Sequence, residues 1–156
     1  YTYEAADASF ELLLRGEVEG RARRYFRTES WRAIVEDRPD GTHANEATVK
    51  LWAKGERIVA TAEGNGPVNA LDRALRVALE RIYPQLAKLE LVDYKVRILE
   101  GRTGTESTTR VLITTGDGTG DWATVGVAEN VIAASWQALE DAYTYGLLRA
   151  GVEPTE

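Results

Sequence analysis

Two glycines and a proline stand between a strand-like run and a helix-like run, where a small anion could bind. The residues are Gly64, Gly66 and Pro67. Gly66 occupies the position of a helix N-cap, and Pro67 that of the first helical residue, which needs no N–H. The first N–H groups of a helix point into such a turn and favour an anion such as a carboxylate. A short Gly-x-Gly-Pro also suits a plain strand-to-helix turn, so spacing alone leaves both interpretations open.

The elements that position this turn belong to a pattern that occurs twice. Alternating apolar and polar residues predict strands at residues 31–36, 47–51 and 57–62, and Lys54-Gly55 predicts a hairpin turn. Apolar residues at helical spacing then predict a helix over residues 67–83, which Pro84 ends. The same order follows with strands at residues 93–98, 109–114 and 122–127, turns at 101–104 and 116–120, and a helix from Asn130.

The two halves align at an offset of about 64 residues. Ile34 then falls on Ile98, Ala70 on Ala134, and Gly66 on Asn130. The interpretation is an internal duplication of a βββα unit, in which one amphipathic helix covers one face of a three-stranded antiparallel sheet. The predicted fold class is α+β, with two βββα units related by a pseudo-twofold axis.

The first 28 residues do not belong to this repeat. Residues 5–15 have a helix-like spacing of apolar side chains, and residues 16–20 are expected to break it. We interpret residues 1–28 as a connector and residues 29–156 as one domain of two repeats, about 29–87 and 88–150. The chain starts at Tyr1 and contains no methionine, so it is expected to be a piece of a longer polypeptide.

Composition narrows the function classes. The chain has 156 residues, 44% of them hydrophobic, and a net charge of −6 without a long basic run, which argues against nucleic acid binding. No apolar run reaches membrane-spanning length. The lack of cysteine excludes disulfides, zinc-thiolate sites and thiol catalysis, and it fits a cytoplasmic protein.

Two further classes remain as weaker alternatives. A stand-alone enzyme lacks an evident nucleophile and base, because the only histidine, His43, lies in a turn-like segment and is expected to be an exposed loop residue. One histidine also cannot build a multi-histidine metal site, so no metal is expected in this chain. A phosphate or nucleotide binder would need Lys-Ser/Thr after the glycines, or a full Gly-x-Gly-x-x-Gly in a parallel βαβ unit.

Several segments together resemble a known family. The chain is similar to the C-terminal regulatory domain of the α-isopropylmalate synthases, and most similar to the citramalate synthase branch. The segments that carry the resemblance occur in the family's order and comprise residues 6–14, 46–50, 62–71, 93–97 and 124–135.

The resemblance implies a larger parent enzyme. In this family an upstream TIM-barrel domain condenses acetyl-CoA with a 2-oxo acid, using a divalent metal. The C-terminal domain carries no catalytic residue or cofactor of its own. It forms a homodimer and binds the end product of the pathway, which is leucine for the isopropylmalate enzymes and isoleucine for many citramalate enzymes. A purely structural dimerisation domain, without an effector, is the alternative.

The resemblance also assigns a candidate effector site. The family's site lies near the dimer interface and involves the loop that matches the Gly-x-Gly-Pro turn, with a less well-matched second loop. The expected residues are Gly64, Asn65, Gly66, Pro67, Val68, Asn69 and Ala70, with Gly126, Val127, Asn130, Ile132 and Ala134. The effector's carboxylate would accept backbone N–H bonds, and Glu63, Glu129 or backbone carbonyls would accept from its ammonium. Tyr83, Tyr94 and Trp136 would wall the apolar pocket or belong to the core.

Overall fold

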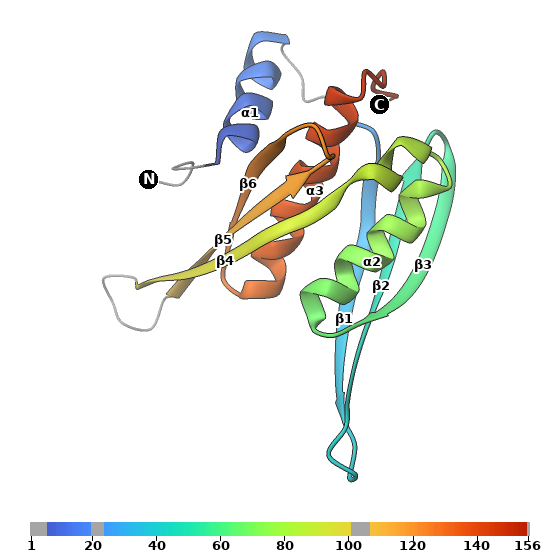
Figure 1. The fold of residues 1–156 in the computed structure, drawn as a ribbon, viewed down its shortest axis with the longest axis vertical. Coiled ribbons are helices and arrows are strands. Elements are labelled where there is room, and N and C mark those ends of the chain that lie inside the picture. Colours follow the sequence, from blue (N-terminus) through green and yellow to red (C-terminus); the bar gives the residue numbers. More distant parts are fainter. Residues whose placement is uncertain (1–5, 20–23, 101–106, 156) are drawn as a thin grey trace. The chain divides into compact units, whose positions relative to one another are not determined.

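A computed structural model describes residues 6–19, 24–100 and 107–155 of the chain. The described residues form two compact units (Figure 1). The first unit comprises residues 24–87 with 153–155, and the second comprises residues 88–152 with the N-terminal helix. The predicted turn at residues 101–104 lies outside the described residues.

The first unit is a three-stranded antiparallel sheet covered by one helix. Its strands are β1 (Arg27–Asp37), β2 (His43–Ala53) and β3 (Glu56–Gly64), in the order β1-β2-β3, and its helix is α2 (Pro67–Glu80). Lys54 and Gly55 both have positive φ angles, of 50° and 77°, as a two-residue type I′ hairpin turn requires. Between sheet and helix, the fully buried side chains include Val49, Leu51, Ile58, Leu71, Leu75 and Leu79. A 3-10 turn, η1 (Pro84–Lys88), follows α2.

The second unit repeats this arrangement. It contains β4 (Glu90–Glu100), β5 (Ser107–Gly116) and β6 (Asp121–Ala128), in the order β4-β5-β6, followed by α3 (Val131–Arg149). The buried side chains between this sheet and α3 include Val111, Ile113, Thr124, Leu139, Tyr143 and Leu147. The prediction of two βββα units is therefore confirmed.

The strand register defines the duplication more closely than the sequence does. Asn45 pairs with Gly64 in the first sheet, and Thr109 pairs with Ala128 in the second, which is an offset of 64 residues for both strands. The first strands differ, because Ala33 pairs with Ala47 whereas Val96 pairs with Val111. Their offset is therefore 63 residues. The predicted match of Ile34 with Ile98 was wrong by one position, and Val35 is the counterpart of Ile98.

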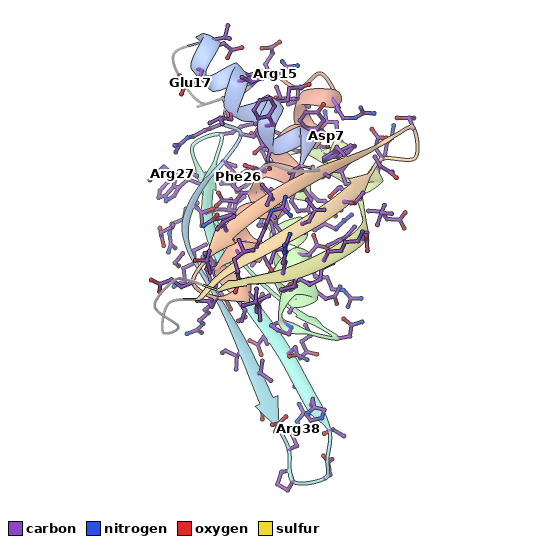
Figure 2. All side chains as sticks on the ribbon, turned by 90° about the vertical axis from the view of Figure 1, so that its left-hand side faces the viewer. Asp7, Arg15, Glu17, Phe26, Arg27 and Arg38 are labelled. Atoms are coloured by element: carbon purple, nitrogen blue, oxygen red, sulfur yellow. The ribbon has the colours of Figure 1, made fainter. Side chains whose placement is uncertain are left out.

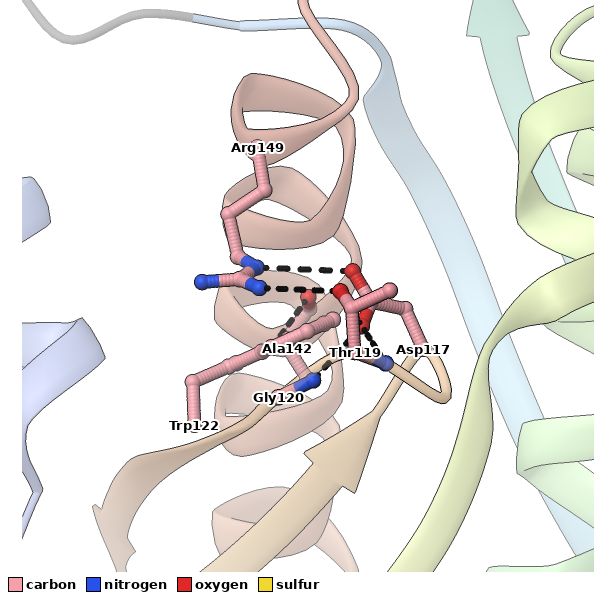
Figure 3. Close-up of polar contacts among 6 residues, drawn as sticks. All are labelled: Asp117, Thr119, Gly120, Trp122, Ala142 and Arg149. Carbon is pink, nitrogen blue, oxygen red and sulfur yellow. Dashed lines mark hydrogen bonds and ion pairs between the residues drawn. The ribbon is translucent and has the colours of Figure 1, made fainter.

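The loop between β5 and β6 is held to the C-terminal end of α3 (Figure 3). Asp117 Oδ1 accepts hydrogen bonds from the hydroxyl and N–H of Thr119, at 2.7 and 2.9 Å, and from the N–H of Gly120 at 3.1 Å. These bonds, with the nearby Arg149 guanidinium, hold the pKa of Asp117 at about 2. Trp122 Nε1 donates to the carbonyl of Ala142 at 3.1 Å, which fixes the start of β6 against the same helix.

The N-terminal helix belongs to the second unit. Helix α1 (Asp7–Glu19) continues through Gly16, so the expected break at residues 16–20 was wrong within the described residues; Figure 2 labels Asp7, Arg15 and Glu17 along it. The N–H of Ala123 donates to Asp7 Oδ1 at 3.0 Å, and the N–H of Val125 donates to Ser9 Oγ at 2.9 Å. Side chains of α1 thus satisfy N–H groups of β6, a strand that pairs only with β5 in its sheet.

A carboxyl group of α3 completes this contact. Ser9 Oγ donates to Asp141 Oδ2 at 2.8 Å. Burial is the main cause that raises the pKa of Asp141 to about 6, and the neighbouring Glu140 carboxylate adds to the rise. The serine hydroxyl therefore joins the edge of β6 to α3 through the first turn of α1.

Candidate functional site

The predicted turn in the first unit leads directly into the N-terminus of α2. Gly66 is the N-cap, with φ −164° and ψ 170°, and Pro67 is the first helical residue. The N–H of Ala70 donates to the carbonyl of Gly66 at 2.9 Å, which closes the first helical turn. Gly66 has no side chain, so it provides no cap for the N–H groups of Val68 and Asn69. This helix end therefore suits an external acceptor such as a carboxylate.

Gly64 and Gly66 have different roles in the turn. A Cβ on Gly64 would lie 2.6 Å from the backbone nitrogen of Ala70 and 2.5 Å from Asn69 Oδ1. Gly64 is therefore needed because the end of β3 packs directly on the first turn of α2. A Cβ on Gly66 would have no neighbour within 4 Å, and its φ is accessible to any residue. Packing does not require glycine at position 66.

Polar contacts fix the shape of this loop. The N–H of Asn65 donates to Asn69 Oδ1 at 3.1 Å, so the asparagine of the helix holds the backbone of the turn. Arg73 Nη1 donates to the carbonyl of Glu63 at 3.3 Å. A guanidinium therefore lies one strand residue away from the turn and adds positive charge near the α2 N-terminus. Arg73 was not among the site residues predicted from the sequence; its position nearly two helical turns after the Gly-x-Gly-Pro was the available signal.

The second helix N-terminus differs in one decisive respect. Its N-cap, Asn130, accepts from the N–H of Ala133 through Oδ1 at 2.8 Å. The side-chain oxygen of Asn130 thus occupies the position that an external acceptor would take. Nearby, Ser135 Oγ donates to the carbonyl of Val131 at 2.6 Å and lies 3.0 Å from the hydroxyl of Tyr94, which ties β4 to the first turns of α3.

The glycine of the second loop has a packing role. A Cβ on Gly126 would lie 1.8 Å from the carbonyl oxygen of Ala134, so β6 touches the backbone of α3 at this position. The adjacent N–H of Val127 donates to Gln137 Oε1 at 3.0 Å. Gly126 and Ala134 are both buried, whereas Val127 and Ile132 are half-buried and lie nearer the surface. The arrangement accounts for Gly126 and Ala134 without a ligand.

The residues considered for an ammonium group are not equivalent. Glu63 lies on β3 between Ala62 and Gly64, and successive side chains of a strand point to opposite faces. Ile58 and Ala60 face α2 and are buried, so Glu63 points to the other face of the sheet, away from α2. Glu129 is exposed and immediately precedes the N-cap of α3. Of the two carboxylates, Glu129 is the one beside a helix N-terminus.

Of the three aromatic residues considered for the apolar pocket, two belong to the core and one lies at a helix N-terminus. Tyr83 lies beyond the C-terminal end of α2, and its hydroxyl donates to the carbonyl of Tyr25 at 2.5 Å. Trp136 is 4% exposed, and its Nε1 donates to Glu140 Oε1 at 2.5 Å. Both are core residues of their units. Tyr94 is half-buried and is the only one of the three that lies at a helix N-terminus.

Two kinds of feature are absent from the described residues. Within that part of the chain, no three or more His, Asp or Glu side chains gather in a way that could hold a metal ion. In the same residues, no helix has the length and apolar character needed to cross a membrane.

Comparison with known proteins gives consistent matches. The family model for the LeuA allosteric (dimerisation) domain matches residues 4–147. The (R)-citramalate synthase of Streptomyces coelicolor is 86% identical over 156 residues, all of this chain, and that of Aquifex aeolicus is 47% identical over 150 residues, or 96%. A 2-isopropylmalate synthase of Aquifex aeolicus is 37% identical over 103 residues, or 66% of this chain. The chain spans only 29%, 28% and 18% of the lengths of these three relatives.

Proposed function

The chain belongs to the family of LeuA allosteric (dimerisation) domains, and from this premise we propose that it is the regulatory and dimerisation part of a citramalate synthase. The 86% identity to a protein named (R)-citramalate synthase supports this branch over the 2-isopropylmalate synthases, whose similarity is lower and shorter. In this proposal the domain performs no chemistry. It senses a branched-chain amino acid made downstream of the synthase.

The difference between the two helix N-termini carries the effector proposal. Two duplicated units retain the same strand-to-helix turn, but Asn130 caps α3 with its own side chain whereas Gly66 leaves α2 without one. The carboxylate of the effector binds at the N–H groups of the first turn of α2, where Arg73 adds positive charge. Each such charge-assisted hydrogen bond contributes about 1.5–3 kcal/mol.

The remaining groups of the effector need other partners. Its ammonium binds a carboxylate or backbone carbonyls, and the Glu63 side chain points to the face of the sheet that α2 does not cover. Its branched side chain needs an apolar pocket, where one methylene changes affinity by only about 1–3 kcal/mol. Citramalate synthases predominate among the matches. Because the resemblance implies isoleucine for many enzymes of that branch, we propose isoleucine as the effector over leucine.

The rest of the parent protein completes the proposal. An upstream TIM-barrel domain condenses acetyl-CoA with a 2-oxo acid and holds the divalent metal, and the enzyme works as a homodimer in the cytoplasm. This chain then holds the two subunits together and favours one arrangement of the dimer when the effector is bound.

A thermal-shift screen tests effector binding. Isoleucine, leucine and valine are each titrated into the parent enzyme, with glycine as a control that lacks the apolar side chain. A ligand present at 100 times its Kd stabilises the fold by about 2.7 kcal/mol, so a saturating increase in melting temperature is expected for at least one branched-chain amino acid.

Purely structural dimerisation is the second candidate, and the capped α3 N-terminus favours it, because one of the two related sites needs no ligand. No thermal shift with any branched-chain amino acid, in a protein that is still dimeric by light scattering, would replace the effector proposal with this one.

A further inference from the structure

Helix α1 has apolar residues on two opposite sides, and its more buried side packs on β6 and α3 of its own unit. Ala8, Leu12 and Gly16 follow one another at a spacing of four, and with Ser9 they form the buried or half-buried side against β6 and α3. Phe10, Leu14 and Val18 follow at the same spacing, half a turn further round the helix. Their side belongs to the surface of the unit.

The outward side is a continuous apolar stripe. Phe10 is 41% exposed, Leu13 44%, Leu14 47% and Val18 86%. Single apolar residues on a surface are ordinary, but four on one face of a 13-residue helix form a patch that marks a contact. Charged residues border the stripe, including Arg15 and Glu11, which form an ion pair of 3.1 Å. An apolar centre with a polar rim is the usual composition of a protein interface.

Hydrogen bonds on the inward side of α1 hold the helix in one orientation. Asp7 and Ser9 bond to β6, and Ser9 also bonds to Asp141 of α3. The helix therefore cannot roll to bury its outward side against its own unit without breaking all three hydrogen bonds.

We propose that the outward face of α1, formed by Phe10, Leu13, Leu14 and Val18, is the docking surface for the catalytic part of the parent polypeptide. The inference rests on the proposed parent enzyme but not on effector binding. This chain is 29% of the length of its 86% identical relative, so most of such a parent lies outside it. In the proposed order the catalytic part precedes α1, and a covalent tether gives it a high effective concentration at this helix.

Site-specific photo-cross-linking in the full-length parent enzyme tests this surface. Val18 is replaced by p-benzoylphenylalanine, and in a matched variant the same replacement is made at Val77, an exposed valine of α2. Each variant is irradiated after its synthase activity has shown that it is folded, and the cross-linked peptides are identified by mass spectrometry.

Position 18 is expected to cross-link to peptides of the catalytic part at ten times the yield of position 77 or more. Cross-links from position 18 into residues 1–156 of a second copy would overturn the proposal in favour of a contact between copies of this domain. Equal yields at both positions, or no cross-link at position 18, would also overturn it. A parent enzyme that binds no branched-chain amino acid would still give the expected cross-links, so the two proposals fail separately.

Discussion

At the scale of single residues, the structure requires glycine at two of the three glycine positions in the candidate loops and not at the third. Gly64 and Gly126 are required by the close approach of a strand to a helix backbone, whereas Gly66 is surrounded by open space. Sequence reasoning treats these glycines alike, because the sequence does not show at which of them an added Cβ would collide with a neighbouring atom. The N-cap positions of Gly66 and Asn130 were predicted correctly from local signals alone.

A substitution at Gly66 should separate binding from folding. Gly66→Asp places a carboxylate where the effector's carboxylate would bind, and we expect the affinity for the amino acid to fall below detection by calorimetric titration. The variant should be as stable as the parent or slightly more so, because aspartate is a good N-cap and its Cβ meets no atom. Gln85→Asp, with the same change of charge at an exposed residue of η1, is the control and should bind normally. Unchanged affinity in Gly66→Asp would refute the loop assignment.

A substitution at Gly126 should affect stability instead. The added Cβ of Gly126→Ala would collide with the carbonyl of Ala134, so β6 and α3 must move apart. We expect a loss of about 1–3 kcal/mol in the free energy of unfolding, measured by urea denaturation. Gly66→Ser also adds a Cβ, but in open space, and should show no loss. Equal effects in the two variants would contradict the packing argument.

At the scale of elements, alternation and helical spacing predicted all six strands and both long helices. The strands β2, β3, β5 and β6 and both helices bury apolar side chains, whereas no described side chain of β1 or β4 is fully buried, so in those two strands the alternation alone gave the prediction. The alignment of β1 with β4 was wrong by one residue because five residues connect β1 to β2, whereas six connect β4 to β5. The predicted extent of α1 was wrong because a single glycine lowers helix propensity without ending a helix, and Gly16 lies within α1. The bonds from Asp7 and Ser9 to β6 join residues 116 positions apart, which no local pattern reveals.

The burial of Asp141 on α3 should make stability depend on pH. Because the pKa of Asp141 is raised from 3.8 to about 6, the folded state binds a proton that the unfolded state releases between these values. The stabilising effect is fully present below about pH 4 and is lost as pH rises through about 6, by at most about 3 kcal/mol.

Melting temperatures from pH 2 to pH 7 provide the measurement. Asp141→Asn keeps an acceptor for Ser9 but cannot titrate, so this component of the pH dependence should disappear. Asp117→Asn is a control of opposite sign, because a carboxyl group with a pKa of about 2 stabilises the fold above its unfolded pKa and loses this effect in acid. If Asp141→Asn had the same pH profile as the unsubstituted protein, Asp141 would not be the group that causes the loss of stability between pH 4 and pH 6.

At the scale of the whole molecule, the proposed sensor acts only through the rest of the parent enzyme. The full-length Gly66→Asp variant should therefore keep the turnover of the unsubstituted enzyme in the absence of effector. Its inhibition by isoleucine should be lost, with the inhibition curve shifted at least a hundredfold to higher concentration, as about 2.7 kcal/mol of lost binding requires. Initial rates at increasing isoleucine concentration provide the measurement. A variant that is inactive without isoleucine would show that the turn acts in catalysis or assembly instead.

The bonds from α1 to β6 also bear on how this domain can be shortened. A version that starts at Arg24 would lack Asp7 and Ser9, and the N–H groups of Ala123 and Val125 would lose their acceptors. A strand edge with unsatisfied N–H groups is a template for pairing with other chains. Such a version would keep both sheets and both covering helices, yet we expect it to aggregate during expression. Helix α1 thus protects the edge of β6 against aggregation.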